Sequence, residues 1–201
     1  MLLCIKKGKG RKRSSNTTLQ NVSIPNNETM ITLFYENDNI FNQDTYDNII
    51  DQVDFMTVRC PHCKHSGCLT KHARYKRTFR LPDSTITISI LRVLCKECGH
   101  THAVLLCEFV PYSQILLDDQ ISIIRSDDEN TYISDNPNLE KSDYRYVRKQ
   151  FSLYWKQRLI SCSLSLDENP VYRCFREFRK QFMQIKCTIN ALHHVTHIRF
   201  F

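Results

Sequence analysis

Alternating apolar and polar residues in the middle of the chain predict a β-hairpin. The first strand has a mostly apolar face of Tyr75, Arg77, Phe79 and Leu81 and a basic face of Arg74, Lys76, Thr78 and Arg80. The turn-forming sequence Pro82-Asp83-Ser84 follows, and residues 85–94 return as a β-branched strand. A short apolar run over 30–35 predicts another strand upstream.

Helical spacing of apolar residues predicts four helices. They span 44–55, about 113–125, 143–160 and a segment that begins at Asn169-Pro170. Ser113 and Ser142 are expected to cap the second and third helices, because a serine hydroxyl accepts a hydrogen bond from a first-turn N–H. The expected buried stripes are Tyr46, Ile49, Ile50 and Val53 in the first helix, Leu117, Ile121 and Ile124 in the second, and Tyr144, Val147, Phe151, Tyr154, Trp155 and Leu159 in the third.

The net charge of +7 hides an alternation of basic and acidic segments along the 201 residues. Basic residues dominate 59–107 and 144–201, whereas acidic residues dominate 30–58 and 108–143. Two basic segments favour a polyanionic partner such as a nucleic acid. The alternative, that the acidic segments neutralise the basic ones within the fold, is equally compatible with the sequence.

The ten cysteines bear on the compartment in which the protein works. No apolar run approaches the roughly 18–20 residues that cross a bilayer, and the first residues lack the apolar core of a signal peptide. Cysteines without an export signal indicate free thiols in a reducing compartment, where metal binding is favoured over disulfides. The sequence therefore predicts a cytoplasmic protein with no membrane segment.

The strongest chemical signal is a pair of Cys-x-x-Cys sequences. The first is Cys60-Pro-His-Cys63, and the second is Cys95-Lys-Glu-Cys98, which is followed by Gly99. Each pair can grip one ion from a tight turn, and the hairpin between the pairs returns the chain to its starting point, as in a zinc ribbon. Because four thiolates fill the shell of Zn²⁺, the metal is expected to be structural rather than catalytic.

Further side chains that bind metals crowd the same region. They are His62, His65, Cys68, His100 and His102. Cys68 or a nearby histidine is an alternative to one of the four cysteines, and His102 is suited to hydrogen-bond a ligand from behind.

Basic side chains on the hairpin and on the helix over 143–160 are the candidate DNA contacts. They are Arg74, Lys76, Arg77, Arg80 and Arg92 on the hairpin, and Arg145, Arg148, Lys149 and Lys156 on the helix. Such regular spacing on a strand or a helix face can follow successive phosphates. The helices over 113–125 and 143–160, with the break at Asn136-Pro137-Asn138 between them, stand in the order of a helix-turn-helix motif.

Signatures of common enzyme classes are absent from the sequence. It has no Walker loop, no G-x-S-x-G and no H-E-x-x-H. A group of carboxylates at Asp118, Asp119, Asp127, Asp128 and Glu129 lies in or beside one helix, whereas two-metal nucleases draw such groups from separate strands. The protein is therefore expected not to be an enzyme and to have no small-molecule substrate.

Several of these sequences together resemble a family of small bacterial proteins of unknown function. The resemblance covers about 30–186 and is carried by Cys60-Pro-His-Cys63, the basic strand over 74–80, Cys95-Lys-Glu-Cys98-Gly-His-Thr-His102, Val110-Pro-Tyr-Ser-Gln114 and Gln181-Phe-Met-Gln-Ile-Lys186. That family is similar to the N-terminal zinc-ribbon and helix-turn-helix region of insertion-sequence transposases. The resemblance implies a zinc-ribbon fold, zinc ligation by Cys60, Cys63, Cys95 and Cys98, and an association with mobile elements. The catalytic domain of those transposases has no counterpart in this chain.

The expected architecture is α+β, with a zinc ribbon followed by a helical, helix-turn-helix-like domain. The expected parts are a disordered basic extension over 1–29, a zinc-ribbon domain over 30–110, a helical domain over 111–186 and a tail over 187–201; whether Met1 or Met30 is the functional start stays open. The expected function is zinc-dependent, non-catalytic DNA binding derived from a transposase, with a transposase or recombinase protein as a further partner. The alternative is an adaptor whose zinc ribbon docks a polymerase or recombinase subunit.

Overall fold

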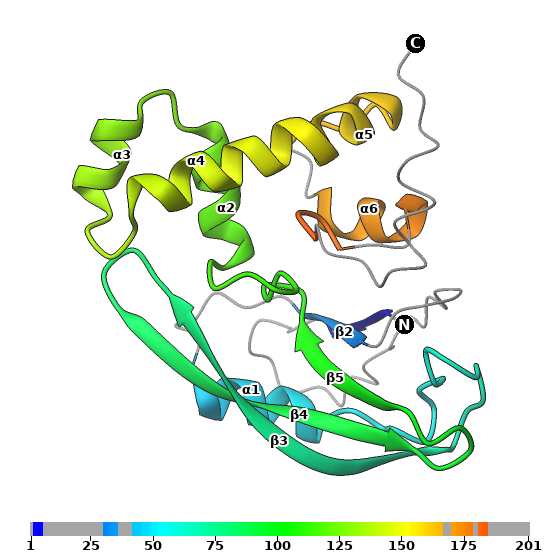
Figure 1. The fold of residues 1–201 in the computed structure, drawn as a ribbon. Coiled ribbons are helices and arrows are strands. Elements are labelled where there is room, and N and C mark those ends of the chain that lie inside the picture. Colours follow the sequence, from blue (N-terminus) through cyan, green and yellow to red (C-terminus); the bar gives the residue numbers. More distant parts are fainter. Residues whose placement is uncertain (1, 6–29, 36–41, 167–169, 179–180, 185–201) are drawn as a thin grey trace, which may run out of the picture. The chain divides into compact units, whose positions relative to one another are not determined.

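A computed structural model describes residues 2–5, 30–35, 42–166, 170–178 and 181–184 of the chain. The fold is mixed α+β (Figure 1). Its contacts divide the chain into two compact units. The first contains the described residues up to Arg77 together with Ile88–Cys107, and the second contains Thr78–Thr87 and the described residues from Glu108 onward. No helix within these described ranges is both long enough and apolar enough to cross a membrane.

The first unit is organised around a five-stranded sheet with the order β1-β2-β5-β4-β3. Its strands are β1 (Leu2–Ile5), β2 (Met30–Tyr35), β3 (Leu69–Arg80), β4 (Thr85–Cys95) and β5 (Thr101–Leu106). β2 runs parallel to both β1 and β5, whereas β4 and β5 are antiparallel. The predicted strand over 30–35 and the predicted hairpin are confirmed, and the hairpin is longer than expected because β3 begins at Leu69.

β1 corrects the expectation that the whole of 1–29 is disordered. Its four residues pair in register with β2, from Leu2 opposite Thr32 to Ile5 opposite Tyr35. The sequence hides this strand because a four-residue apolar run beside a basic cluster has no periodicity of its own; the pairing comes from β2. The rest of the expected extension, 6–29, lies outside the described residues, as does the expected tail over 187–201.

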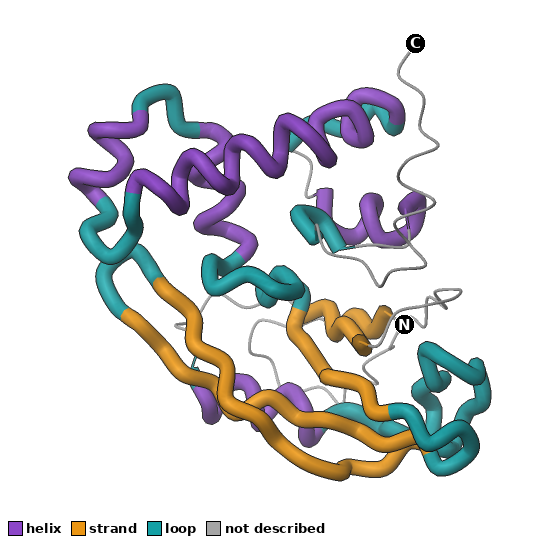
Figure 2. Tube along the Cα trace, viewed as in Figure 1, coloured by secondary structure: helices purple, strands orange, loops and turns teal. Residues whose placement is uncertain are grey.

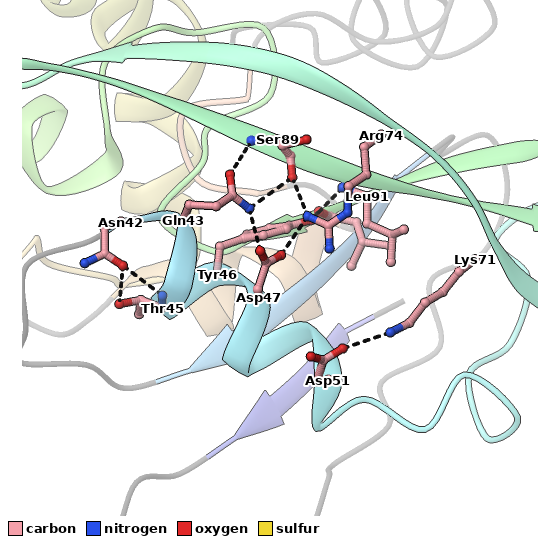
Figure 3. A network of polar contacts seen from close by, with 11 residues as sticks. Asn42, Gln43, Thr45, Tyr46, Asp47, Asp51, Lys71, Arg74, Ser89 and Leu91 are labelled. Atoms are coloured by element: carbon pink, nitrogen blue, oxygen red, sulfur yellow. Dashed lines mark hydrogen bonds and ion pairs between the residues drawn. The ribbon is translucent and has the colours of Figure 1, made fainter.

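Helix α1 (Gln43–Asp51) packs against the sheet and confirms the predicted helix over 44–55, although it ends earlier. The side chain of Asn42 caps it by accepting a hydrogen bond from the N–H of Thr45 (2.9 Å). Tyr46 is fully buried, and its hydroxyl donates to the carbonyl of Val104 (2.8 Å) and accepts from the N–H of Leu91 (2.9 Å). One tyrosine thus fastens the helix to both β5 and β4, as Figure 3 shows for the β4 side.

The second unit contains most of the helices. They are α2 (Leu117–Arg125), α3 (Glu129–Asp135), α4 (Lys141–Gln150), a π-helical turn η1 (Phe151–Trp155), α5 (Lys156–Ser161) and α6 (Pro170–Phe178). Its core is aromatic: Trp155 is fully buried, with edge-to-face contacts to Phe178 and Phe182. α6 begins where Asn169-Pro170 predicts a helix start.

The cap predicted for the second helix is wrong, and of its predicted buried stripe only Leu117 is buried. Ser113 does not cap α2, because the helix begins at Leu117. The side-chain amide of Gln120 donates to Ser113 Oγ (3.0 Å) and to the carbonyl of Ile115 (2.9 Å), and it is buried with them. Gln120 and Ile123 are buried, whereas Ile121 and Ile124 are half-exposed.

The helix predicted over 143–160 is present but is not uniform. It starts at Lys141, one residue before the expected Ser142 cap, and the Asp143 carboxylate accepts the N–H of Glu140 (3.0 Å). The π-helical turn at η1 shifts the helix faces, so Trp155 is buried while Tyr154 is 37% exposed. An extra helix, α3, lies between the two predicted helices, where the sequence predicted only the break at Asn136-Pro137-Asn138.

Candidate metal centre and basic surfaces

The two Cys-x-x-Cys sequences form turns at one end of the hairpin. The first turn precedes β3, and the second joins β4 to β5; both are loop segments at the same end of these strands in Figure 2. The sulfurs of Cys60, Cys63, Cys95 and Cys98 all lie within 4.8 Å of one another. The hairpin therefore brings together two pairs that are far apart in the sequence, as predicted.

The distances between the sulfurs fit a single tetrahedral ion. The Sγ atoms of Cys60 and Cys98 are 3.7 Å apart, and those of Cys63 and Cys95 are 3.6 Å apart. Four sulfurs bound at about 2.3 Å to one tetrahedral ion lie about 3.8 Å from each other. The four cysteines are therefore a candidate metal site with a complete set of soft ligands.

The two turns share one backbone geometry, which places the sulfurs. The N–H of Cys60 donates to the carbonyl of His65 (2.8 Å), and the N–H of Lys64 donates to the carbonyl of Cys60 (3.0 Å). The second turn repeats this pattern, with Cys95 N–H to His100 O (2.9 Å) and Gly99 N–H to Cys95 O (2.9 Å). Lys64 and Gly99 occupy equivalent positions, and both have positive φ values, 67° and 70°. The sequence identifies only the second of these, because Lys64 is not a glycine.

Burial and hydrogen bonding shift the pKa values of the clustered thiols. Burial raises the pKa of the Cys60 thiol to about 12. Burial also opposes ionisation of Cys63, but hydrogen bonds from His65 and from the neighbouring thiols bring the pKa of Cys63 down to about 6. Because a soft divalent ion binds thiolates, its binding would release the protons that buried thiols such as Cys60 otherwise keep.

Two of the additional candidate ligands, both buried, contact sulfurs of the four-cysteine group without belonging to it. His102 is buried, and its Nε2 lies 3.2 Å from the Sγ of Cys60, a distance at which the ring can hydrogen-bond that sulfur. Cys68 is buried as well, with its Sγ 3.3 Å from the Sγ of Cys95. Neither side chain takes the place of one of the four cysteines in the group of mutually close sulfurs.

Two exposed histidines line the same end of the strands. The rings of His62 and His100 stack with 3.7 Å between their centroids. Together with Cys98 they form a second group of close ligand atoms. This group shares its only sulfur with the four-cysteine site and is more exposed.

On the hairpin, two of the arginines predicted to contact DNA have acidic partners. Arg74 donates to Asp47 (2.6 Å) and to the carbonyl of Ser89 (3.0 Å), as Figure 3 shows. Arg80 donates to Asp143 at 2.6 Å. The guanidinium of Arg92 lies over the ring of Tyr75, 4.8 Å from its centroid.

The remaining hairpin candidates differ in exposure. Arg77 is half-buried, which suits its place on the mostly apolar face, and Lys76 is exposed. No ion pair of Lys76 occurs among the described residues.

The arginines of α4 are also engaged within the second unit. Arg145 forms a two-pronged contact with the carboxylate of Glu129, at 2.8 Å for each nitrogen. Arg148 donates to the carbonyls of Ile123 (3.3 Å) and Ser126 (2.5 Å), which lie at the C-terminal end of α2. Lys149 and Lys156 are exposed, and the described part of the chain provides no acidic partner for either. Part of the basic charge is therefore neutralised within the fold, which was the alternative left open by the sequence.

Three consecutive helices occupy the place of the expected helix-turn-helix. α4 packs against both α2 and α3. Residues 126–128 join α2 to α3, and residues 136–140 join α3 to α4. α3 carries Glu129 and Asp135 and has no basic residue, so its charge does not suit a DNA groove.

A scan of protein-family models, a search of the curated proteins and a search of the solved structures each find no match.

Proposed function

We propose that Cys60, Cys63, Cys95 and Cys98 bind one zinc ion as the structural centre of a zinc ribbon. The observation that carries this proposal is the pair of sulfur distances, 3.6 and 3.7 Å, close to those expected around a tetrahedral Zn²⁺. Four thiolates would leave no position for water or substrate on the ion, so it would stabilise the fold without taking part in a reaction. Zinc sites of this kind contribute on the order of 10 kcal/mol to the folding of small modules.

Metal content tests this proposal. The purified protein should contain one zinc ion per chain by native mass spectrometry and by elemental analysis. Cys95→Ser should lose the ion, because three thiolates remain, whereas Cys162→Ser should keep it. Cys162 is a suitable control because it is a half-exposed free thiol in the second unit. A folded wild-type protein without bound metal would contradict the proposal.

We also propose that the zinc-stabilised protein binds DNA without catalysing a reaction on it, and that it is related to transposases of mobile elements. The net positive charge and the exposed lysines Lys76, Lys149 and Lys156 support the binding, because these lysines have no acidic partner among the described residues. The resemblance of the motifs to transposase zinc-ribbon regions supports the relation. Because Arg74, Arg80 and Arg145 already pair with carboxylates, the proposal rests on the lysines.

Salt-dependent DNA binding by lysine variants tests the second proposal. Lys149→Ala combined with Lys156→Ala should weaken binding to random duplex DNA and reduce the slope of log affinity against log salt by about 0.9 for each lost contact. Zinc content and helicity should be unchanged. Lys141→Ala is the matched control, because Lys141 is at the start of the same helix but donates to Asn130 (2.7 Å). Equal binding by the double variant and the wild type would contradict a role for this helix.

One observation favours the alternative function, an adaptor for a polymerase or recombinase subunit. Exposed apolar side chains recur every seven residues along the helical segment from α4 to α5: Tyr146 is 51% exposed, Leu153 is 54% exposed and Ile160 is 59% exposed. Large apolar side chains that stay exposed to solvent are typical of protein-binding surfaces, although the π-helical turn between Tyr146 and Ile160 keeps their spacing from placing them in one row. Absence of DNA binding by the wild type, together with a partner lost on Leu153→Ser but kept on Lys149→Ala, would place the adaptor first.

A further inference from the structure

The cluster contains one more thiol than a tetrahedral ion can use. Cys60, Cys63, Cys95 and Cys98 satisfy the geometry of the site, and Cys68 lies beside them with a side chain only 3% exposed. Its Sγ is 3.2 Å from the carbonyl oxygen of His65, to which the thiol can donate. Cys68 would therefore remain a thiol next to a ligand while the four other sulfurs hold the ion.

The distance between Cys68 and Cys95 sets this pair apart from the others. Their sulfurs are 3.3 Å apart, whereas the pairs that fit the edges of the tetrahedron are 3.6 and 3.7 Å apart. Disulfide formation requires the two sulfurs to approach about 2.05 Å, so this pair has the shortest path of the three. Cys68 is also the one partner that can react without first leaving the ion.

We propose that Cys68 and Cys95 form a site of reversible thiol oxidation through which hydrogen peroxide releases the metal. This inference rests on the proposed zinc binding. Cysteine thiolates are oxidised by peroxides to sulfenic acids, which condense with a neighbouring thiol. The short contact supplies that neighbour inside the site.

The reaction has two steps. The Cys95 thiolate attacks one oxygen of hydrogen peroxide, the O–O bond breaks, and the products are Cys95 sulfenic acid and hydroxide. The Cys68 sulfur then attacks the sulfenic sulfur, the S–O bond breaks, and the thiol proton leaves with the hydroxyl group as water. The two sulfurs lose two electrons in total, and the two peroxide oxygens gain them. The disulfide removes Cys95 from the ion, which is left with three thiolates.

The exposure of the individual cysteines indicates from which side an oxidant can reach the cluster. Cys63 and Cys98 are half-exposed, whereas Cys60, Cys68 and Cys95 are buried. The half-exposed Cys63 and Cys98 therefore mark the side from which a small peroxide can reach the cluster. Cys63 is more exposed than Cys95, but both sulfurs would be bound to the ion. Cys68 is not a ligand, so its sulfur is the one available to form a disulfide with an oxidised Cys95.

The experiment compares zinc release by three forms of the full-length, zinc-loaded protein. Each form is treated with hydrogen peroxide, free zinc is followed with a chromogenic chelator, and disulfides are mapped by mass spectrometry. The wild type should release its zinc, form the Cys68–Cys95 disulfide and take up zinc again after reduction. Cys68→Ser should hold one zinc before treatment and release it several-fold more slowly. Cys162→Ser should behave as the wild type does.

The outcomes separate this inference from the zinc proposal on which it rests. A protein purified without zinc overturns both. Bound zinc that is released equally fast from Cys68→Ser overturns the oxidation site alone, and so does a disulfide between Cys60 and Cys98 or between Cys63 and Cys95 in place of the proposed one. If Cys68→Ser fails to hold zinc, Cys68→Ala and the disulfide map of the wild type decide the question.

Discussion

At the scale of single residues, the two metal-binding turns place unequal demands on equivalent positions. Lys64 and Gly99 both follow a Cys-x-x-Cys pair directly, and both adopt left-handed backbone conformations. Glycine adopts this conformation without strain, whereas a side chain brings Cβ close to the carbonyl oxygen. Lys64 therefore carries strain that Gly99 avoids.

We expect reciprocal substitutions at these positions to have opposite effects on stability. Gly99→Ala should lower the free energy of unfolding by about 1 kcal/mol, although nothing lies within 4 Å of the added Cβ, because the strain is in the backbone. Lys64→Gly should raise the free energy of unfolding by about 0.5 kcal/mol, since the relief exceeds the entropy gained by the unfolded chain. Denaturant unfolding of the zinc-loaded protein measures both. A stabilising Gly99→Ala would show that the second turn does not need positive φ.

The sequence predicted the four cysteines of the site because their spacing is a local property. It could not predict that Cys68 touches Cys95, nor that Lys64 is equivalent to Gly99, because both depend on how the turns fold. The face of α2 was only partly predicted for a similar reason: Leu117 is buried as expected, but Gln120, whose amide makes two hydrogen bonds inside the unit, is buried while Ile121 and Ile124 are half-exposed.

At the scale of secondary-structure elements, the arginines of α4 connect this helix to its neighbours. Arg148 reaches the carbonyls at the end of α2, and Arg145 reaches Glu129 at the start of α3. The last carbonyls of a helix have no partner within the helix and carry partial negative charge. Arg148 therefore acts as a C-terminal cap supplied by another helix. The sequence assigned it to DNA, because a basic stripe does not reveal which of its members meet carbonyls.

Replacement of Arg148 should therefore lower the stability of the fold, whatever its effect on DNA binding. Arg148→Ala should lower the free energy of unfolding by about 1 kcal/mol, because the carbonyls at the end of α2 lose charged donors. Lys149→Ala, one residue further along the same helix, should leave stability unchanged. Thermal unfolding followed by circular dichroism gives both values. Equal stability of the two variants would mean that solvent replaces Arg148 at no cost.

At the scale of the whole molecule, the acidic and basic segments partly account for each other. Asp47 and Asp51 of an acidic segment pair with Arg74 and Lys71 of the first basic one, and Glu129 pairs with Arg145 of the second. Exposed ion pairs of this kind contribute little to stability, but they reduce the charge that is left for a polyanion. The alternation of basic and acidic segments therefore suggests more unpaired positive charge than the structure has. The lysines without acidic partners among the described residues indicate better where positive charge is left.

Removal of residues 1–29 tests how the sheet is completed. With β1 present, β2 lies between two strands, and Ile31 and Leu33 are fully buried. A chain that begins at Met30 would expose the free edge of β2 and lose the hydrogen bonds of four paired residues. At about 0.5–1 kcal/mol for each hydrogen bond and roughly one bond for each paired residue, we expect a loss of about 2–4 kcal/mol in the free energy of unfolding. Calorimetry of the full-length and shortened chains, both loaded with zinc, measures the difference. The control is a chain that keeps 1–29 and has Leu3 replaced by proline, a residue that strands tolerate poorly, so that it should also lose stability at unchanged length. An unchanged melting temperature of the shortened chain would show that β1 adds no stability and that the folded protein starts at Met30.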